Sequence, residues 1–397
     1  MKTSRSQRLK LIGAIENKRK SKLITYITSD RFGLNVQIAE DIICKIHKQL
    51  LLNKINEKDN IDLFIYSRGG DSDVPWALVS MIREYIPKGS FNVIIPYKAH
   101  SAATVIALGA DEIIMCKKGE LGPIDATTYG PYNPYDELTK QKKPISVEDV
   151  NGFFNLAEKL KWENGKSELL KILTNKVEPL ALGTVNRILD QTKLVATRLL
   201  KTRKDKLQDK EIEEIVKKIS SEIYSHRHAI NRTEGRNYLK INFIVDAETV
   251  NIDKEAWSLF EHYSSLFELD NPFMPEQYLL ENSLDEFTWT DLNLACIESK
   301  SMLHLAKKDM TVKAIKAVPN QVQLNLNNLT LPPFNIPNNI PNLDINAIQI
   351  AIKQYFDIIV PKVLNDASKN VTKDFLKALP QQGFQRIDLK SSWQEIK

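Results

Sequence analysis

Short apolar runs alternate with amphipathic segments along the first third of the chain. The apolar runs, which predict strands, cover residues 61–66, 91–96 and 112–115. The segments with helical spacing of apolar side chains cover residues 35–52, 75–85 and 102–109. Strands and helices that alternate at this spacing predict right-handed βαβ units on a parallel sheet, and therefore the α/β class.

The pattern changes twice further along the chain. Between about residues 146 and 221 it is helical and rich in charge, with one long apolar stripe from Leu182 to Leu200. After about residue 245 Asn, Pro and aromatic residues become more frequent, and the prolines among residues 331–342 predict an extended loop. An amphipathic helix is predicted at residues 345–365. We therefore expect a smaller C-terminal α+β appendage.

Charge is distributed unevenly along the 397 residues, which carry a formal net charge of +5. Residues 1–25 hold eight Lys and Arg residues against Glu16 alone, a net charge of +7, so the remaining chain carries −2. A basic arm of this kind could contact phosphate groups or anionic lipid. Because Tyr26 is the nearest aromatic residue, base stacking is not indicated and nucleic acid is not an expected partner. We expect an arm that is solvated or contacts other subunits.

The composition is that of a globular protein, since 42% of residues are hydrophobic and 26% are charged. No apolar run approaches the roughly 18 residues of a membrane span, and Glu16 and Asn17 interrupt the first apolar run too early for a secretory signal. Cys44, Cys116 and Cys296 lie far apart without a C-x-x-C pair, so neither a metal site nor a disulfide framework is expected. We expect a cytoplasmic protein without a metal or other cofactor.

Two glycines, Gly69 and Gly70, follow directly after the predicted strand at residues 61–66. Glycines at a strand end allow a sharp turn and expose backbone N–H groups, as an oxyanion hole or a phosphate site requires. A plain turn between a strand and a helix is the alternative interpretation of this pair.

Ser101 lies between a predicted strand end and small residues that open a helix. A nucleophilic serine at such a junction can use the following N–H, here that of Ala102, to hold a developing oxyanion. The alternative is that Ser101 is only a helix N-cap. A third turn, residues 119–125, contains Asp125 as a possible orienting carboxylate.

Taken in order, these segments resemble the Clp-fold serine peptidases, and within them the serine dehydrogenase proteinase (SDH) family, which is related to signal peptide peptidase A (protease IV). The stretches that carry the resemblance are residues 63–71, 96–102, 107–113 and 121–125. The similarity extends from about residue 19 to residue 243 and includes residues 225–230. It implies a Clp/crotonase-like spiral of βαβ units that assembles as a homo-oligomer.

The resemblance and the composition together predict three parts of the chain. We expect a basic N-terminal arm at residues 1–25, a Clp-fold serine peptidase domain at residues 26–245, and a C-terminal accessory region of unknown role at residues 246–397. In the peptidase domain the resemblance assigns Ser101 as the nucleophile. It assigns the oxyanion hole to the N–H groups of Gly69 or Gly70 and of Ala102.

The general base is the least determined part of the predicted site. The histidine of the Clp protease would fall near residues 124–125, where this chain has none, so a Ser-His-Asp triad is less expected than a Ser-Lys dyad. Protease IV relatives use a lysine from a later helix, and a lysine base must be desolvated to lose its proton. Lys193 is the best match to that lysine by position. The other candidates are Lys142, Lys143, His100, His226 and His228.

The sequence therefore predicts a serine endopeptidase that hydrolyses peptide or protein substrates through an acyl-enzyme on Ser101. The chain lacks a G-x-x-x-x-G-K-[ST] motif, so any ATP-driven step would require a separate ATPase or regulatory partner. Two alternatives remain at this point. One is a crotonase-type acyl-CoA enzyme, which would not need Ser101, and the other is a non-catalytic oligomeric scaffold that has lost its base.

Overall fold

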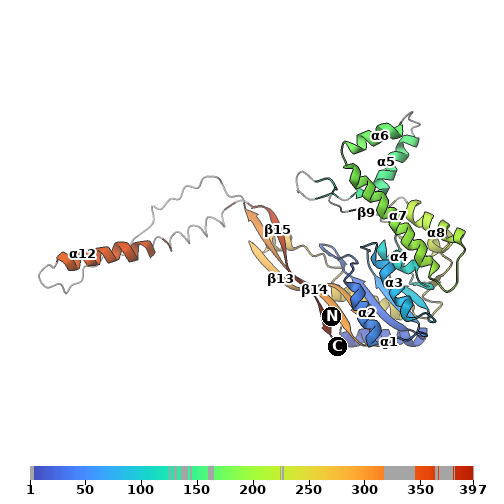
Figure 1. Cartoon of the computed structure of the whole chain (residues 1–397). Helices are drawn as coiled ribbons and strands as arrows, with labels where there is room; N and C mark the ends of the chain where they lie inside the picture. Colours follow the sequence, from blue (N-terminus) through green and yellow to red (C-terminus); the bar gives the residue numbers. More distant parts are fainter. Residues whose placement is uncertain are drawn as a thin grey trace. The chain divides into compact units, whose positions relative to one another are not determined.

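The computed structural model of the chain describes residues 4–124, 127–128, 132–135, 142–143, 145–159, 165–223, 225, 228–316, 345–362, 365, 379 and 381–396. The chain divides into two compact units. Unit 1 comprises residues 1–273, 291–308 and 391–397, and unit 2 comprises residues 274–290 and 309–390. Figure 1 shows the elements of both units.

An eight-stranded sheet has the strand order β12-β7-β5-β4-β1-β13-β14-β15. Its first five strands are parallel to one another: β1 (Lys22–Thr28), β4 (Ile61–Tyr66), β5 (Phe91–Ile95), β7 (Glu112–Met115) and β12 (Ile244–Asp246). The parallel pairing predicted for residues 61–66, 91–96 and 112–115 is confirmed. Three long strands follow in the sheet order, of which β13 pairs antiparallel to β1: β13 (Glu286–Glu298), β14 (Leu303–Lys316) and β15 (Gln381–Ile396).

Helices cover both faces of the parallel strands, as a strand buried along its whole length requires. Alternate residues such as Leu63 and Ile65 face the helices α2 (Ile42–Leu52), α3 (Val74–Tyr85), α4 (Ala102–Leu108), α7 (Pro179–Lys201) and α8 (Asp209–Ser221). Phe64 and Tyr66 face the other way, toward α1 (Arg5–Arg19) and α10 (Asp253–Phe267). The helices predicted at residues 75–85 and 102–109 correspond to α3 and α4. The helix predicted at residues 35–52 is confirmed only from Ile42 onward, as α2, because Asn35 belongs to a short strand and residues 36–41 are not helical.

Helix α1 lies within the predicted basic arm, and it packs against α10. Its apolar side chains Ile12 and Ile15 are fully buried. Its basic side chains are also engaged: Arg8 Nε donates to Glu298 Oε2 at 2.6 Å, and Arg19 forms ion pairs with two carboxylates of the sheet. The predicted division at residue 25 therefore does not coincide with a boundary between compact units, because α1 contributes to the core of unit 1.

A second, smaller sheet has the strand order β11-β8-β6 and holds the chain that leads into α4. Its strands are β6 (Lys98–Ala99), β8 (Glu120–Leu121) and β11 (Ile230–Asn231). β6 is parallel to β8, and β8 is antiparallel to β11. Residues on both sides of Ser101 are therefore anchored, by β6 before it and by the buried helix α4 after it.

One ion pair ties the end of α3 to the start of β7. Arg83 Nη1 donates to Asp111 Oδ2 at 2.7 Å, and the backbone N–H groups of Lys204 and Phe91 also donate to this carboxylate. Burial alone would raise the pKa of Asp111, but these hydrogen bonds, that of Arg83 first, lower the pKa below its ordinary value.

The remaining elements of unit 1 are short strands and helices outside the large sheet. They are β2 (Asp30–Arg31), β3 (Leu34–Asn35), β9 (Thr127–Thr128), β10 (Ile145–Ser146), α5 (Val147–Lys159), α6 (Gly165–Thr174) and α9 (Arg232–Asn237). Every helix in the described part of the chain is too short or too polar to cross a membrane.

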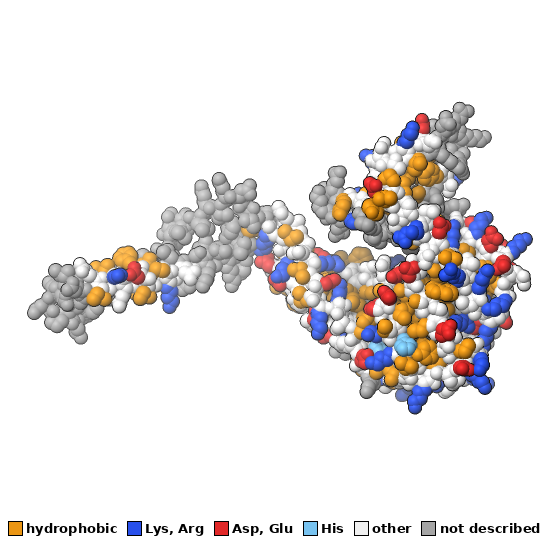
Figure 2. Space-filling model, in the orientation of Figure 1, with side chains coloured by type: hydrophobic (Ala, Val, Ile, Leu, Met, Phe, Trp, Pro, Cys, Tyr) orange, Lys and Arg blue, Asp and Glu red, His pale blue; other side chains and the backbone are white. Residues whose placement is uncertain are grey.

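Unit 2 contains α11 (Pro275–Glu281), parts of β13, β14 and β15, and the helix α12 (Ile345–Gln354) with a π-helical turn at Tyr355–Ile359. The last two elements correspond to the helix predicted at residues 345–365, whereas the proline-rich residues 331–342 lie outside the described residues. Apolar side chains gather on the surface of α12 and the turn after it (Figure 2), where Ile350, Phe356 and Ile358 are exposed.

Candidate active site

Ser101 occupies a strained position directly before α4. Its φ of 50° and ψ of −118° lie outside the regions that most residues with a side chain adopt. Such a conformation costs roughly 1–3 kcal/mol, and in known structures it is concentrated at functional sites. Ser101 occupies the N-cap position of α4, but its side chain makes no capping hydrogen bond to the helix. The side chain is half-buried.

The Gly69–Gly70 turn is brought against Ser101 by pairing between the end of β4 and the residues around β6. Ser67 donates its N–H to Lys98 O at 2.9 Å and accepts from His100 N at 3.0 Å. A Cβ added to Gly69 would lie only 2.6 Å from the Ser101 Cβ, and the Gly69 φ is +99°. Glycine is therefore the residue that this close approach and this backbone conformation allow.

The two glycines differ in what their N–H groups do. Gly69 donates its N–H to Ser67 Oγ at 3.1 Å. Gly70 forms a parallel bridge with Ile38. The two hydrogen bonds of this bridge run from Ile38 N to Gly69 O and from Asp71 N to Ile38 O, so the Gly70 N–H points away from Ile38. Among the described residues, neither the Gly70 N–H nor the Ala102 N–H has an acceptor.

Ser67 is a buried residue of this site that the sequence analysis did not select. It is fully buried, and its hydroxyl accepts hydrogen bonds from Thr28 Oγ1 at 2.9 Å and from Gly69 N. The two contacts connect the end of β1 with the glycine turn. No sequence signal marks them, because Thr28 and Ser67 come from separate strands.

His100, directly before Ser101, forms an ion-pair contact with a carboxylate. His100 Nε2 lies 3.0 Å from Glu120 Oε1, and both side chains are largely buried. The ring packs on Gly122, where an added Cβ would lie 2.9 Å from the His100 Cγ. His100 is thus held beside the nucleophile with one ring nitrogen engaged by Glu120.

Lys193 lies on α7, which packs against α3 and α4. Gln191 Nε2 donates to Asp73 Oδ1 at 3.3 Å, so this part of α7 runs beside the residues that follow the glycine turn. The half-buried Lys193 lines a groove of about 370 Å³ together with α8 residues such as Glu213 and Val216. No hydrogen bond joins Lys193 to Ser101 in the described part of the chain, where Ser101 Oγ has no hydrogen-bond partner at all.

The other predicted base candidates lie in separate surroundings. His228 is exposed, and its Nε2 contacts Glu234 Oε1 at 2.8 Å. Lys142 lies 5.6 Å from the centre of the Tyr135 ring, and Lys143 pairs through its backbone with Pro134. His226 and Asp125 lie outside the described residues.

Two basic side chains, Arg68 and Lys98, share one carboxylate beside the glycine turn. Lys98 Nζ lies 2.7 Å from Asp30 Oδ2, Arg68 Nε lies 4.0 Å from the same oxygen, and Tyr66 donates its hydroxyl to Asp30 Oδ1 at 2.5 Å. Burial and, next, the Asp30 charge raise the pKa of Tyr66, so Tyr66 stays a neutral donor. No local sequence pattern marks this cluster, because its members come from three separate segments of the chain.

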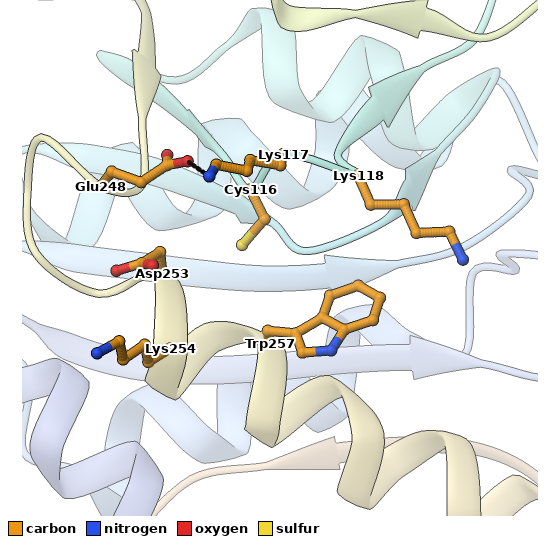
Figure 3. Close-up of a pocket in the computed structure, with 7 residues that line it drawn as sticks. All are labelled: Cys116, Lys117, Lys118, Glu248, Asp253, Lys254 and Trp257. Carbon is orange, nitrogen blue, oxygen red and sulfur yellow. Dashed lines mark ion pairs between the residues drawn. The ribbon is translucent and has the colours of Figure 1, made fainter.

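A separate cavity of about 350 Å³ lies on the face of the sheet that α10 covers. Figure 3 shows the Cys116 thiol pointing toward it and the Trp257 ring along its wall. Burial and, next, the Glu248 charge raise the pKa of Cys116 to about 12, so the thiol is protonated at neutral pH. In the described residues no group of three or more His, Cys, Asp or Glu side chains could hold a metal ion.

Comparison with known proteins supports the family resemblance for the first part of the chain. Residues 1–178 match the family of ClpP-like SDH-type serine proteinases, which confirms the resemblance predicted from the sequence for those residues. That segment contains Ser101, both glycines and Ala102, whereas Lys193 and His226 lie beyond it.

Two relatives and one solved structure show further similarity. The uncharacterized protein MJ1495 of Methanocaldococcus jannaschii is 25% identical over 65% of this chain and 76% of its own length. The uncharacterized protein MJ0137 of the same organism is 31% identical over 30% of this chain and 42% of its own length. A ClpP1 mutant from Listeria monocytogenes covers 60% of this chain and 98% of its own, with 15% identity and a TM-score of 0.30.

Proposed function

We propose that this chain, whose residues 1–178 match the ClpP-like SDH-type serine proteinases, is a serine peptidase that acts through an acyl-enzyme on Ser101. The observation that carries the proposal is the strained backbone of Ser101, packed against Gly69 so closely that no side chain fits between them. A structural serine gains nothing from this conformation, whereas a nucleophile requires its hydroxyl to be held apart from the helix that follows.

The proposed reaction begins when Ser101 Oγ attacks the carbonyl carbon of the scissile peptide bond. The hydroxyl proton passes to the general base, and the N–H groups of Gly70 and Ala102 donate to the oxyanion that forms. The C–N bond then breaks, the base returns the proton to the leaving amine, and an ester on Ser101 remains. A water molecule then attacks the ester carbon and gives a proton to the base. The bond between this carbon and Ser101 Oγ breaks, and the base returns the proton to Ser101. Gly69 has a supporting role, because its N–H is engaged by Ser67.

For the general base we retain Lys193, in a Ser-Lys dyad. The proposal is supported by the packing of α7 against α3 and against α4, the helix that Ser101 precedes. Lys193 lies two residues after Gln191 and therefore on the opposite face of α7, where it lines the groove with α8. The competing base is His100, supported by its contact with Glu120 and its position beside Ser101. Hydrogen bonds to a catalytic base often form only when substrate binds, so the unpartnered Ser101 hydroxyl is compatible with either residue.

A fluorophosphonate probe, which reacts covalently with activated serines, tests the proposal. We expect labelling of the wild type and none of Ser101→Ala, with Ser72→Ala as the matched control because Ser72 lies in the same region without a side-chain hydrogen bond in the described structure. Lys193→Met should lower the labelling rate by at least 100-fold if Lys193 is the base, and His100→Gln should leave it within about threefold. A loss of at least 100-fold in His100→Gln, with Lys193→Met within about threefold of the wild type, would instead identify His100 as the general base.

The same experiment examines the alternative of a non-catalytic scaffold, in which no general base activates the Ser101 hydroxyl. A folded wild type that is not labelled at any pH between 6 and 10 would contradict the peptidase and support the scaffold. Labelling that persists in Ser101→Ala would place the nucleophile elsewhere.

We also propose that the chain cleaves within peptides and assembles as a homo-oligomer. The assembly is supported by exposed apolar side chains on α5, α6 and α7, namely Leu156, Leu170, Ile172 and Leu180. Light scattering on the purified protein should give a mass that is a multiple of 45.4 kDa. A monomer at micromolar concentration would contradict this assembly.

A further inference from the structure

Asp30 is a mostly buried carboxylate whose oxygens are already occupied. Oδ1 accepts from the Tyr66 hydroxyl at 2.5 Å, and Oδ2 accepts from Lys98 Nζ at 2.7 Å. The side chain of Asp30 is only 8% exposed. Tyr66 and Lys98 therefore make the short contacts with this carboxylate, each with one of its two oxygens.

Arg68 is left with its hydrogen-bonding capacity unused. Its Nε lies 4.0 Å from Asp30 Oδ2, which is beyond hydrogen-bond distance, and its side chain is 57% exposed. In the described part of the chain the Arg68 guanidinium donates to no acceptor. Two cations share one negative charge here, so the cluster of Asp30, Lys98 and Arg68 carries one surplus positive charge at neutral pH.

The surplus charge lies next to the proposed nucleophile. Arg68 directly precedes Gly69, and Gly69 packs on the Ser101 side chain. Asp71 and Asp73 follow the glycine turn and are exposed. Their hydrogen-bond donors, the Asp73 N–H and the Gln191 amide, are neutral, so both carboxylates keep their negative charge. Among the described residues Arg68 forms an ion pair with neither of them, and its donors stay available. An arginine with free donors binds a carboxylate through two parallel hydrogen bonds, and Asp30 holds this one near its position without saturating it.

We propose that Arg68 binds a carboxylate of the peptide close to the bond that is cleaved, so that this site selects peptides with a negative charge there. The inference rests on the proposed peptidase function. The carboxylate could belong to an acidic side chain or to the C-terminus of the peptide, and the recognising chemistry is the same for both. Lys98 stays with Asp30 and positions the cluster.

Matched covalent probes test the side-chain source. Two peptidyl phosphonates that differ only in Glu or Gln at the residue attached to phosphorus react with Ser101, and the ratio of their labelling rates measures selectivity for the charge. We expect a ratio of about 10 or more in favour of Glu for the wild type, from the strength of a charge-assisted hydrogen bond. Arg68→Gln should bring the ratio to about 1, Arg68→Glu should invert it, and Arg68→Lys should retain part of it.

The control variant is Lys58→Glu, which changes the net charge by the same amount as Arg68→Glu. Lys58 is exposed and lies before the start of β4, at the opposite end of the strand from Arg68. It should keep the wild-type ratio. Circular dichroism of each variant establishes that it is folded, which is expected for a substitution at an exposed side chain.

A second arm distinguishes the C-terminal source. Peptides with a free or an amidated C-terminus are digested, and mass spectrometry measures the relative rates of cleavage near that end. A preference for the free carboxylate that Arg68→Gln removes supports the inference with the C-terminus as the source. Equal rates for both pairs of reagents in the wild type, with Ser101 labelled normally, would overturn the inference and leave the peptidase intact. Absence of any Ser101 labelling would overturn the peptidase and the inference with it.

Discussion

The Ser67 hydroxyl offers a sharp test of how the oxyanion hole is held. In the folded protein this fully buried oxygen accepts from Thr28 Oγ1 at 2.9 Å and from Gly69 N at 3.1 Å. Ser67→Ala leaves both donors buried without an acceptor, at about 1–3 kcal/mol each. We therefore expect the free energy of unfolding to fall by roughly 2–6 kcal/mol, measured by urea denaturation.

The same substitution should lower the rate of the chemical step. Without the hydrogen bond to Ser67, the peptide plane that carries the Gly69 N–H is no longer held in place. The neighbouring peptide plane, which carries the Gly70 N–H, can then turn away from the oxyanion. Removal of one oxyanion donor costs about 10²–10³ in rate, and a misaligned donor costs less, so we expect kinact for the fluorophosphonate to fall by roughly 10- to 100-fold. The apparent binding constant of the probe should change by less than about threefold, since Ser67 does not contact the ligand.

Two further variants separate this role from general destabilisation. Ser72→Ala makes the same chemical change in the neighbouring turn and should keep stability and kinact within error. Thr28→Val combined with Ser67→Ala removes one unpaired donor, so it should recover about 1–2 kcal/mol relative to Ser67→Ala while kinact stays low. Wild-type kinact in a Ser67→Ala protein that is folded would refute the assignment of Ser67 as the residue that positions the turn.

Three other predictions follow from named contacts. Gly69→Ala, whose Cβ would lie 2.6 Å from the Ser101 Cβ, should abolish probe labelling, whereas Gly183→Ala, with open space at the added Cβ on a helix, should raise stability by about 0.5–1 kcal/mol in thermal unfolding. The pKa of Asp111 in the folded protein lies below its ordinary value, so the ionised carboxylate stabilises the fold. This contribution to the free energy of unfolding is full above the unfolded pKa of about 3.9 and is lost as the pH falls through the folded pKa. The wild type should therefore be more stable than Asp111→Asn by roughly 2 kcal/mol at pH 6, and this difference should shrink below pH 4. Iodoacetamide at pH 8 should label the exposed Cys44 in the native protein and leave the buried Cys116 unmodified until urea is added, and rapid native labelling of Cys116 would contradict its raised pKa of about 12.

Most of the regular elements near the site were predictable because their signals are local. The strand at residues 61–66 matches β4 residue for residue, and α3 and α4 begin and end within one residue of the predicted ranges. Each is an apolar run or an apolar stripe bounded by turn residues. By contrast, β1 and the long strands β13, β14 and β15 were not predicted. β1 is a short apolar strand, buried from Leu23 to Thr28, that directly follows the basic residues of the predicted arm. β13 and β14 are partly exposed and partly buried and β15 has no fully buried residue, so no single period runs through these three strands.

The basic arm illustrates how charge count alone misleads about structure. Residues 1–25 carry many positive charges, which favoured a separate solvated segment. In the structure Arg8 and Arg19 are directed at carboxylates of the sheet, while Ile12 and Ile15 are fully buried. The partners Glu298 and Asp62 are distant in the sequence, so the same charges that indicated an arm serve to attach a packed helix.

The sequence by itself determined the candidate nucleophile, the pair of glycines and the order of strands and helices that carries them, because a turn conformation and a strand end depend on neighbouring residues. Only the tertiary structure distinguished Gly70 from Gly69 as the N–H without an acceptor, since that difference arises from the Ser67 hydroxyl and from pairing with Ile38. The unsaturated Arg68 also became visible only there. Hydrogen bonds and ion pairs between segments depend on packing, and one sequence pattern is compatible with many of them.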